Sequence, residues 1–92
     1  MENSIFFNPD TAEWLDLGGG LRRMMMGHDD RIMMVKVDFE RGAVGATHSH
    51  PHSQSSLIER GVFEVTIGGR KKTLRAGDGY FVPSGVEHGA VA

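Results

Sequence analysis

Residues 42–61 read GAVGATHSHPHSQSSLIERG, and residues 77–88 read GDGYFVPSGVEH. Both stretches place metal-binding side chains between glycine, proline and serine, which favour turns. The potential ligands in the two stretches are His48, His50, Gln54 and His88. Imidazole nitrogen is a frequent protein ligand of divalent transition metals. Three imidazoles and one amide at these spacings therefore predict a site for one divalent metal ion.

The segments around these stretches alternate between apolar and polar residues with the period of two that is typical of half-buried strands. In residues 31–40 the inward positions are Val35, Val37 and Phe39, and in residues 62–67 they are Phe63, Val65 and Ile67. Gly68-Gly69 predicts a tight hairpin into residues 70–74. Only residues 11–17 favour a helical turn, with Thr11 as its N-cap. The sequence thus predicts an all-β chain.

Length limits the architecture to one domain that covers residues 1–92. A small all-β chain must close its sheet or pack two sheets together to protect its edges, which favours a jelly-roll barrel. The sequence has no cysteine, so disulfides cannot reinforce the thin core. A metal ion or oligomerisation can supply the missing stability, and we expect a homodimer.

Charge and hydropathy exclude other classes of partner. The net charge of -2 and the pI of 6.2 argue against nucleic acid, which requires a concentrated basic surface. Residues 70–72 form the nearest basic cluster and are expected at a hairpin tip. No apolar run approaches the roughly 18 residues of a membrane span, and the first residues do not resemble a secretory signal. We expect a soluble, cytoplasmic protein with no membrane partner.

Strand parity offers a first account of how the ligands converge. Side chains two residues apart on a strand point to the same face, so His48 and His50 should meet, and Gln54 keeps that parity. His88 would arrive from a separate strand. His52 shares the parity too, and a bend at Pro51 leaves it either as a further ligand or on the rim of the site. His28 lies among turn residues and is expected to have no role in the site.

The neutral amide of Gln54 leaves the full double positive charge on a bound metal. Such a site should be a strong Lewis acid and should attract anionic ligands, which suits non-redox chemistry on sugar acids. Iron-dependent dioxygen chemistry is the competing interpretation, but this ligand set lacks the anionic group that usually assists it. Nickel, manganese, iron and zinc all remain open as the native metal.

The glycine frame carries a resemblance to a known family. Gly42-x5-His48-x-His50-x3-Gln54-x6-Gly61 and Gly77-x5-Pro83-x-Gly85-x2-His88 resemble the two cupin motifs. Residues 17–23, 33–37, 39–45 and 50–54 are, in succession, similar to the small KdgF-type cupins. This resemblance implies a cupin jelly-roll barrel and carries over His48, His50, Gln54 and His88 as the metal ligands.

The resemblance also implies an activity. KdgF-type cupins act in pectin and alginate catabolism and convert 4,5-unsaturated monouronates to linear keto forms. They continue past the position of Ala92 into a strand with an aspartate, a phenylalanine and an arginine, and no residue of this chain matches these. We therefore expect a barrel that lacks its C-terminal strand.

The sequence gives only weak catalytic candidates. His52 could act as a general acid or base if it faces the pocket. Arg60, like Arg22 and Arg23, could pair with a substrate carboxylate. The alternative to an enzyme is a non-catalytic cupin that senses a sugar acid or a metal, and a small metal-dependent dioxygenase is a third interpretation.

Overall fold

The computed structural model describes residues 5–92, which form nine β-strands. The strands are β1 (Leu15–Gly18), β2 (Leu21–His28), β3 (Met33–Phe39), β4 (Val44–His48), β5 (Gln54–Leu57), β6 (Val62–Ile67), β7 (Arg70–Arg75), β8 (Gly79–Val82) and β9 (His88–Val91). The prediction of an all-β chain is confirmed. Residues 5–92 contain no helix of the length and apolar character needed to cross a membrane.

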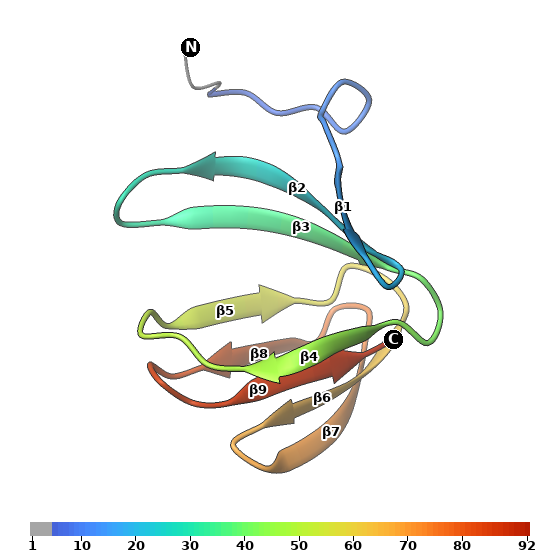
Figure 1. Ribbon diagram of the computed structural model, residues 1–92, viewed down its shortest axis with the longest axis vertical. Helices are drawn as coiled ribbons and strands as arrows, with labels where there is room; N and C mark the ends of the chain where they lie inside the picture. Colours follow the sequence, from blue (N-terminus) through green and yellow to red (C-terminus); the bar gives the residue numbers. More distant parts are fainter. Residues whose placement is uncertain (1–4) are drawn as a thin grey trace.

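The strands form three antiparallel sheets, with the orders β1-β2-β3, β4-β9-β6-β7 and β5-β8. The last strand, β9, lies between β4 and β6, and β8 returns to pair with β5, which are the crossovers of a jelly roll. In Figure 1 the β2–β3 hairpin forms an upper lobe over the remaining strands. The predicted jelly roll is thus the observed architecture.

The core lies between the sheets. Ile58, Val65 and Leu74 are buried at its centre, and Phe63 packs against them. The Phe63 ring meets Phe39 edge to face, with centroids 5.1 Å apart, which joins the upper lobe to the four-stranded sheet. These aromatic residues therefore lie on the inner faces, as their alternation predicts. Val37 remains 41% exposed because its part of β3 faces an open cleft.

Two hairpin turns set the register around the core. Gly68 and Gly69 have positive φ angles of 54° and 79°, so the β6–β7 turn needs residues without a Cβ atom, and the predicted hairpin is confirmed. At the β2–β3 turn the Asp29 carboxylate accepts hydrogen bonds from the backbone N–H groups of Arg31 and Ile32, at 2.8 and 2.9 Å. These hydrogen bonds stabilise the charged carboxylate and so lower the pKa of Asp29, and the bond from Arg31 has the larger effect.

The predicted helical turn over residues 11–17 is wrong. Asn8 organises this segment instead, because its side-chain oxygen accepts from the backbone N–H of Asp10 at 2.9 Å and its carbonyl accepts from that of Ala12 at 2.9 Å. The side-chain bond of Asn8 is a local alternative to helix formation, and the single backbone turn from Asn8 to Ala12 is not continued into a helix. Residues 15–18 then pair with β2 as strand β1, so tertiary pairing overrides the weak helical preference.

Two of the strands that have an unpaired edge lie on either side of an opening in the described part of the chain. β3 pairs only with β2, and β5 pairs only with β8. Both edges line a wide cleft, and Figure 1 shows β3 and β5 running in the same direction on its two sides. The cleft exposes one side of the interior to solvent.

Candidate metal centre

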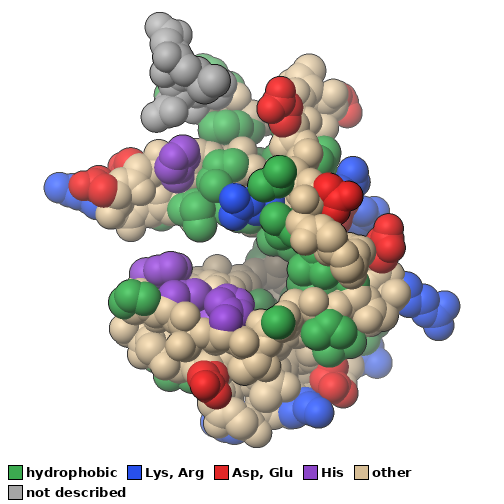
Figure 2. Space-filling model, viewed as in Figure 1, with side chains coloured by type: hydrophobic (Ala, Val, Ile, Leu, Met, Phe, Trp, Pro, Cys, Tyr) green, Lys and Arg blue, Asp and Glu red, His purple; other side chains and the backbone are tan. Residues whose placement is uncertain are grey.

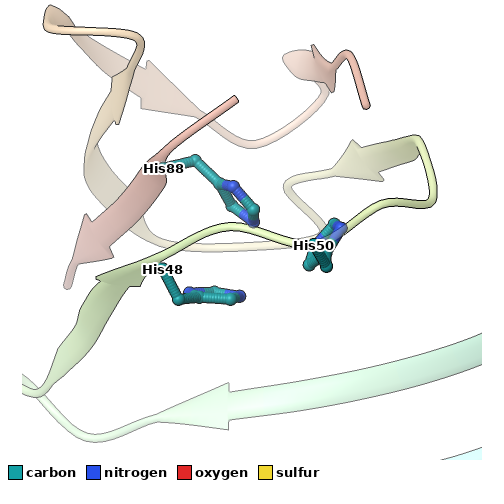
Figure 3. A group of neighbouring side chains, drawn as sticks. All are labelled: His48, His50 and His88. Carbon is teal, nitrogen blue, oxygen red and sulfur yellow. The ribbon is translucent and has the colours of Figure 1, made fainter. Parts of the chain in front are cut away.

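Three histidines from different parts of the chain meet at one end of the four-stranded sheet. His48 is the last residue of β4, His88 is the first residue of β9, and the two are register partners. His50 lies in the loop between β4 and β5. Their ligand atoms all lie within 4.8 Å of one another, and Figure 3 shows the three rings converging. This spacing allows a single ion to contact all three residues.

Backbone carbonyls fix the tautomer of each ring. The Nδ1 atoms of the three histidines lie 2.8–3.0 Å from carbonyl oxygens two residues away, in the pairs His48–Ala46, His50–His52 and His88–Val86. A carbonyl oxygen only accepts, so each Nδ1 carries the proton and donates it. Each Nε2 is then left with a lone pair, which is the arrangement found in metal-binding histidines.

The buried member of the set lacks any other partner. His88 is only 3% exposed, and its Nε2 atom makes no hydrogen bond among the described residues. A buried polar atom without a partner costs about 1–3 kcal/mol, so such atoms in native proteins usually have a reason. A metal ligand position supplies that reason for His88 Nε2.

Gln54 completes the donor set from another sheet, as the first residue of β5. Its Oε1 atom lies 3.0 Å from His50 Nε2, while its amide nitrogen donates to Ser56 Oγ at 2.9 Å. Two lone pairs at this distance repel unless a proton or a cation lies between them. Two adjacent ligands of an octahedral ion bound at about 2.1 Å are themselves about 3.0 Å apart. The four donors therefore fit a divalent metal.

A loop, rather than strand parity, brings His50 to the site. Residues 49–53 lie between strands, so the prediction that His48 to Gln54 continue on one strand face is wrong. Pro51 cannot donate to a ladder, and the loop is held from outside: Gly85 N–H donates to the His50 carbonyl at 2.9 Å, and Ser84 Oγ donates to the Pro51 carbonyl. The second sequence stretch thus positions the first.

Gly89 is a site-forming residue that sequence reasoning missed. A Cβ atom at this position would lie 3.0 Å from the backbone oxygen of Gly45 and 3.1 Å from Thr47 Oγ1. Only glycine therefore lets β9 approach β4 so closely beside His48 and His88. Its place directly after a ligand was the available signal, although the glycine frame of the motif did not include it.

The weaker catalytic candidates lie outside the three-histidine group. The His52 ring is exposed and stacks on His50, with centroids 3.9 Å apart and an interplanar angle of 1°. It lines the cleft beside the ligands, and a catalytic role for it remains a prediction. Arg60 is exposed in the loop after β5 and also lines a smaller cavity with Trp14 and Arg22, so its role in the site likewise remains a prediction.

The chain is similar to known proteins. Residues 35–92 match the Cupin domain family. The pectin degradation protein KdgF of Dickeya dadantii (strain 3937) is 39% identical over 88 residues, which cover 95% of this chain and 80% of that protein.

Two solved structures are also similar. An RmlC-like cupin from Shewanella frigidimarina NCIMB 400 is 45% identical, with a TM-score of 0.94 over 97% of this chain and 80% of that one. KdgF from Halomonas sp. is 37% identical, with a TM-score of 0.91 over 98% of this chain and 83% of that one. This chain therefore belongs to the cupin domain family, among the small cupins of the KdgF type.

Proposed function

We propose that this protein converts 4,5-unsaturated monouronates from pectin or alginate breakdown to their linear keto forms. The similarity to KdgF proteins over nearly the whole chain supports the substrate class. The single observation that carries a metal-dependent mechanism is the buried Nε2 atom of His88, which has no partner among residues 5–92 and faces the lone pairs of two other histidines.

His48, His50, Gln54 and His88 would hold the metal. A divalent ion in this site would act as a Lewis acid on an oxygen atom of the sugar. All four ligands are neutral, so they leave the positive charge of the site available to an anionic substrate. The backbone carbonyls that accept from each Nδ1 keep the rings oriented, which means that substrate binding need not reorganise them.

His52 is the candidate for proton transfer during ring opening and tautomerisation. Its ring is exposed at the cleft and stacks on His50, so it can exchange protons with solvent while it stays next to the ligand set. A general acid or base must reach within about 3 Å of the proton that it moves. Arg60, which is exposed at the edge of the cleft, is the weaker catalytic candidate.

The native metal is one of nickel, manganese, iron and zinc, because imidazole and amide donors suit all four. Dioxygen chemistry is the less favoured use of iron here, since the three-histidine group contains no carboxylate. The same observation favours a second candidate function, a non-catalytic cupin that binds a sugar acid or a metal, because no carboxylate base joins the group. A cytoplasmic location and a homodimer remain predictions from the sequence.

The test is turnover of 4,5-unsaturated galacturonate by metal-loaded protein, followed through the C4 vinyl proton by NMR. His48→Ala removes a ligand, and His28→Ala is a matched control outside the site. We expect the vinyl signal to decay faster than without protein for the original chain and for H28A, and at the background rate for H48A. If the vinyl signal decays with the original chain no faster than without protein, the proposed enzymatic function is wrong. Shifted or broadened sugar signals in that case would favour the binding function.

A further inference from the structure

Two adjacent arginines on β2 point to opposite faces of the sheet, as neighbours on a strand must. Arg22 lies on the outer face, where its guanidinium donates to the Asp38 carboxylate at 2.9 Å and covers the Trp14 ring at 4.1 Å. Its charge is neutralised there and its planar group is occupied. Arg22 also lines the cleft, but the Asp38 carboxylate already pairs with its charge, so it is less suited than an unpaired arginine to bind an anionic ligand.

Arg23 projects from the inner face. Its register partner on β3 is Val37, which shares a face with Phe39, and the Phe39 ring contacts Phe63 in the core. Arg23 is half-buried and lines the same cleft as His48 and His88. Figure 2 shows histidines gathered along the lower wall of this cleft, below the lobe that β2 and β3 form in Figure 1.

The guanidinium of Arg23 has no protein partner within residues 5–92. The salt bridges of this part of the chain join Arg22 to Asp38, Lys36 to Glu59 and Lys71 to Glu64, and none of its side-chain hydrogen bonds involves Arg23. An arginine side chain stays protonated and offers five N–H donors. A half-buried charge beside apolar neighbours such as Val37 is stabilised by an anion.

We propose that Arg23 binds the carboxylate of a uronate in this cleft, so that the histidine site takes a ring or hydroxyl oxygen of the same sugar. Guanidinium and carboxylate groups pair through two parallel hydrogen bonds, which fixes orientation as well as position. One arginine matches the single charge of a monouronate. This inference rests on the proposed function and deepens it, because it assigns the two ends of the substrate to two different walls of the cleft.

The test compares galacturonate with its methyl ester, which has the same ring but no charge, as ligands of the zinc-loaded protein. Arg23→Gln removes the guanidinium charge, Arg23→Lys keeps a charge without the planar fork, and Arg22→Gln is the matched outer-face control. We expect R23Q to weaken galacturonate binding about tenfold or more and to leave the methyl ester within about twofold, with R23K intermediate and R22Q unchanged. Zinc content should be the same in all variants.

Three results would overturn the assignment. One is a galacturonate affinity of R23Q and R23K within twofold of the original chain, which would place the carboxylate on the metal. Another is an equal loss for the acid and the ester, together with a lower unfolding temperature, which would make Arg23 structural. The third is that the original chain binds galacturonate and its methyl ester with the same affinity.

Failure of the inference can be told apart from failure of the proposed function. If galacturonate binding depends on Arg23 but the vinyl signal does not decay, the proposed enzymatic function is wrong and the carboxylate site is supported. If R23Q turns over unsaturated galacturonate with an unchanged KM, the enzymatic function is supported and the assignment of Arg23 to the carboxylate is wrong. If both hold, R23Q should show a KM raised about tenfold or more and a kcat that changes much less.

Discussion

His48 and His88 face each other across the β4–β9 pair as register partners, with ring centroids 4.3 Å apart. β6 pairs with the other side of β9, placing Ile67 opposite His88. This pairing holds His88 within the sheet, whereas His50 depends on a loop. The site therefore has one rigid side and one side whose position depends on hydrogen bonds to residues 84 and 85.

Replacement of His88 by alanine should separate metal binding from folding. Loss of a group that only supports a metal ligand weakens metal binding by about 10–100-fold. Loss of the ligand itself should cost more, so we expect His88→Ala to weaken zinc binding by about 100-fold or more. The metal-free variant should unfold at a temperature close to that of the metal-free original chain, because the change also removes a buried nitrogen without a partner.

Calorimetric titration with zinc and thermal unfolding with and without zinc measure these two effects, with His28→Ala as the control. Zinc should raise the unfolding temperature of the original chain and of H28A, since an ion that binds only the folded state stabilises it. An equal rise for H88A would show that His88 is not a ligand.

Gln54→Glu tests the importance of a neutral donor set. A carboxylate in place of the amide adds a negative charge next to His50 Nε2, so we expect metal affinity to rise about tenfold and uronate affinity to fall by a similar factor. Competition with a chelator measures the first quantity, and titration with galacturonate measures the second. Gln54→Ala serves as the control and should weaken both. Tighter uronate binding by Q54E would contradict the charge argument.

Gly89→Ala tests the close approach of β9 to β4. The added Cβ atom would lie 3.0 Å from a backbone oxygen, which cannot rotate away, so the strands must separate. We expect a loss of about 1–3 kcal/mol in the free energy of unfolding, as for overpacking in a core, and weaker zinc binding because His48 and His88 move apart. Urea unfolding provides the measurement. Val91→Ala, an exposed change on the same strand, should have little effect, and equal stability of G89A and V91A would refute the packing argument.

Local patterns in the sequence were sufficient for much of the fold and for the prediction that His48, His50 and His88 lie together. The alternation around Phe39 and Val65 placed both on inner faces, and Gly68-Gly69 predicted its hairpin, because these features depend on neighbours in the chain. The converging histidines were expected for the wrong reason. His50 reaches the site through hydrogen bonds to its loop from residues 84 and 85, more than 30 positions away, which no local period records.

The arginines show the same limit. Arg22 and Arg23 were equivalent in the sequence, and only the pairing of β2 with β3 decides which one lies on the inner face with Val37. The prediction of a helical turn at residues 11–17 was wrong for a related reason. Residues 15–18 pair with β2, and this tertiary pairing overrides the helical propensity of the segment.

The outer face of β5–β8 provides a test of the expected homodimer. Leu57 and Phe81 are 72% and 58% exposed, while Val82, on the opposite face of β8, is fully buried, so the two exposed side chains project outward from the same small sheet. Apolar side chains grouped on a surface often mark an interface. We expect sedimentation at micromolar concentration to show a dimer for the original chain and a monomer for the double variant Leu57→Ser and Phe81→Ser. Leu17→Ser, an exposed apolar change on β1, should leave the dimer intact, and a monomeric original chain would remove the prediction together with the idea that association supplements so small a core.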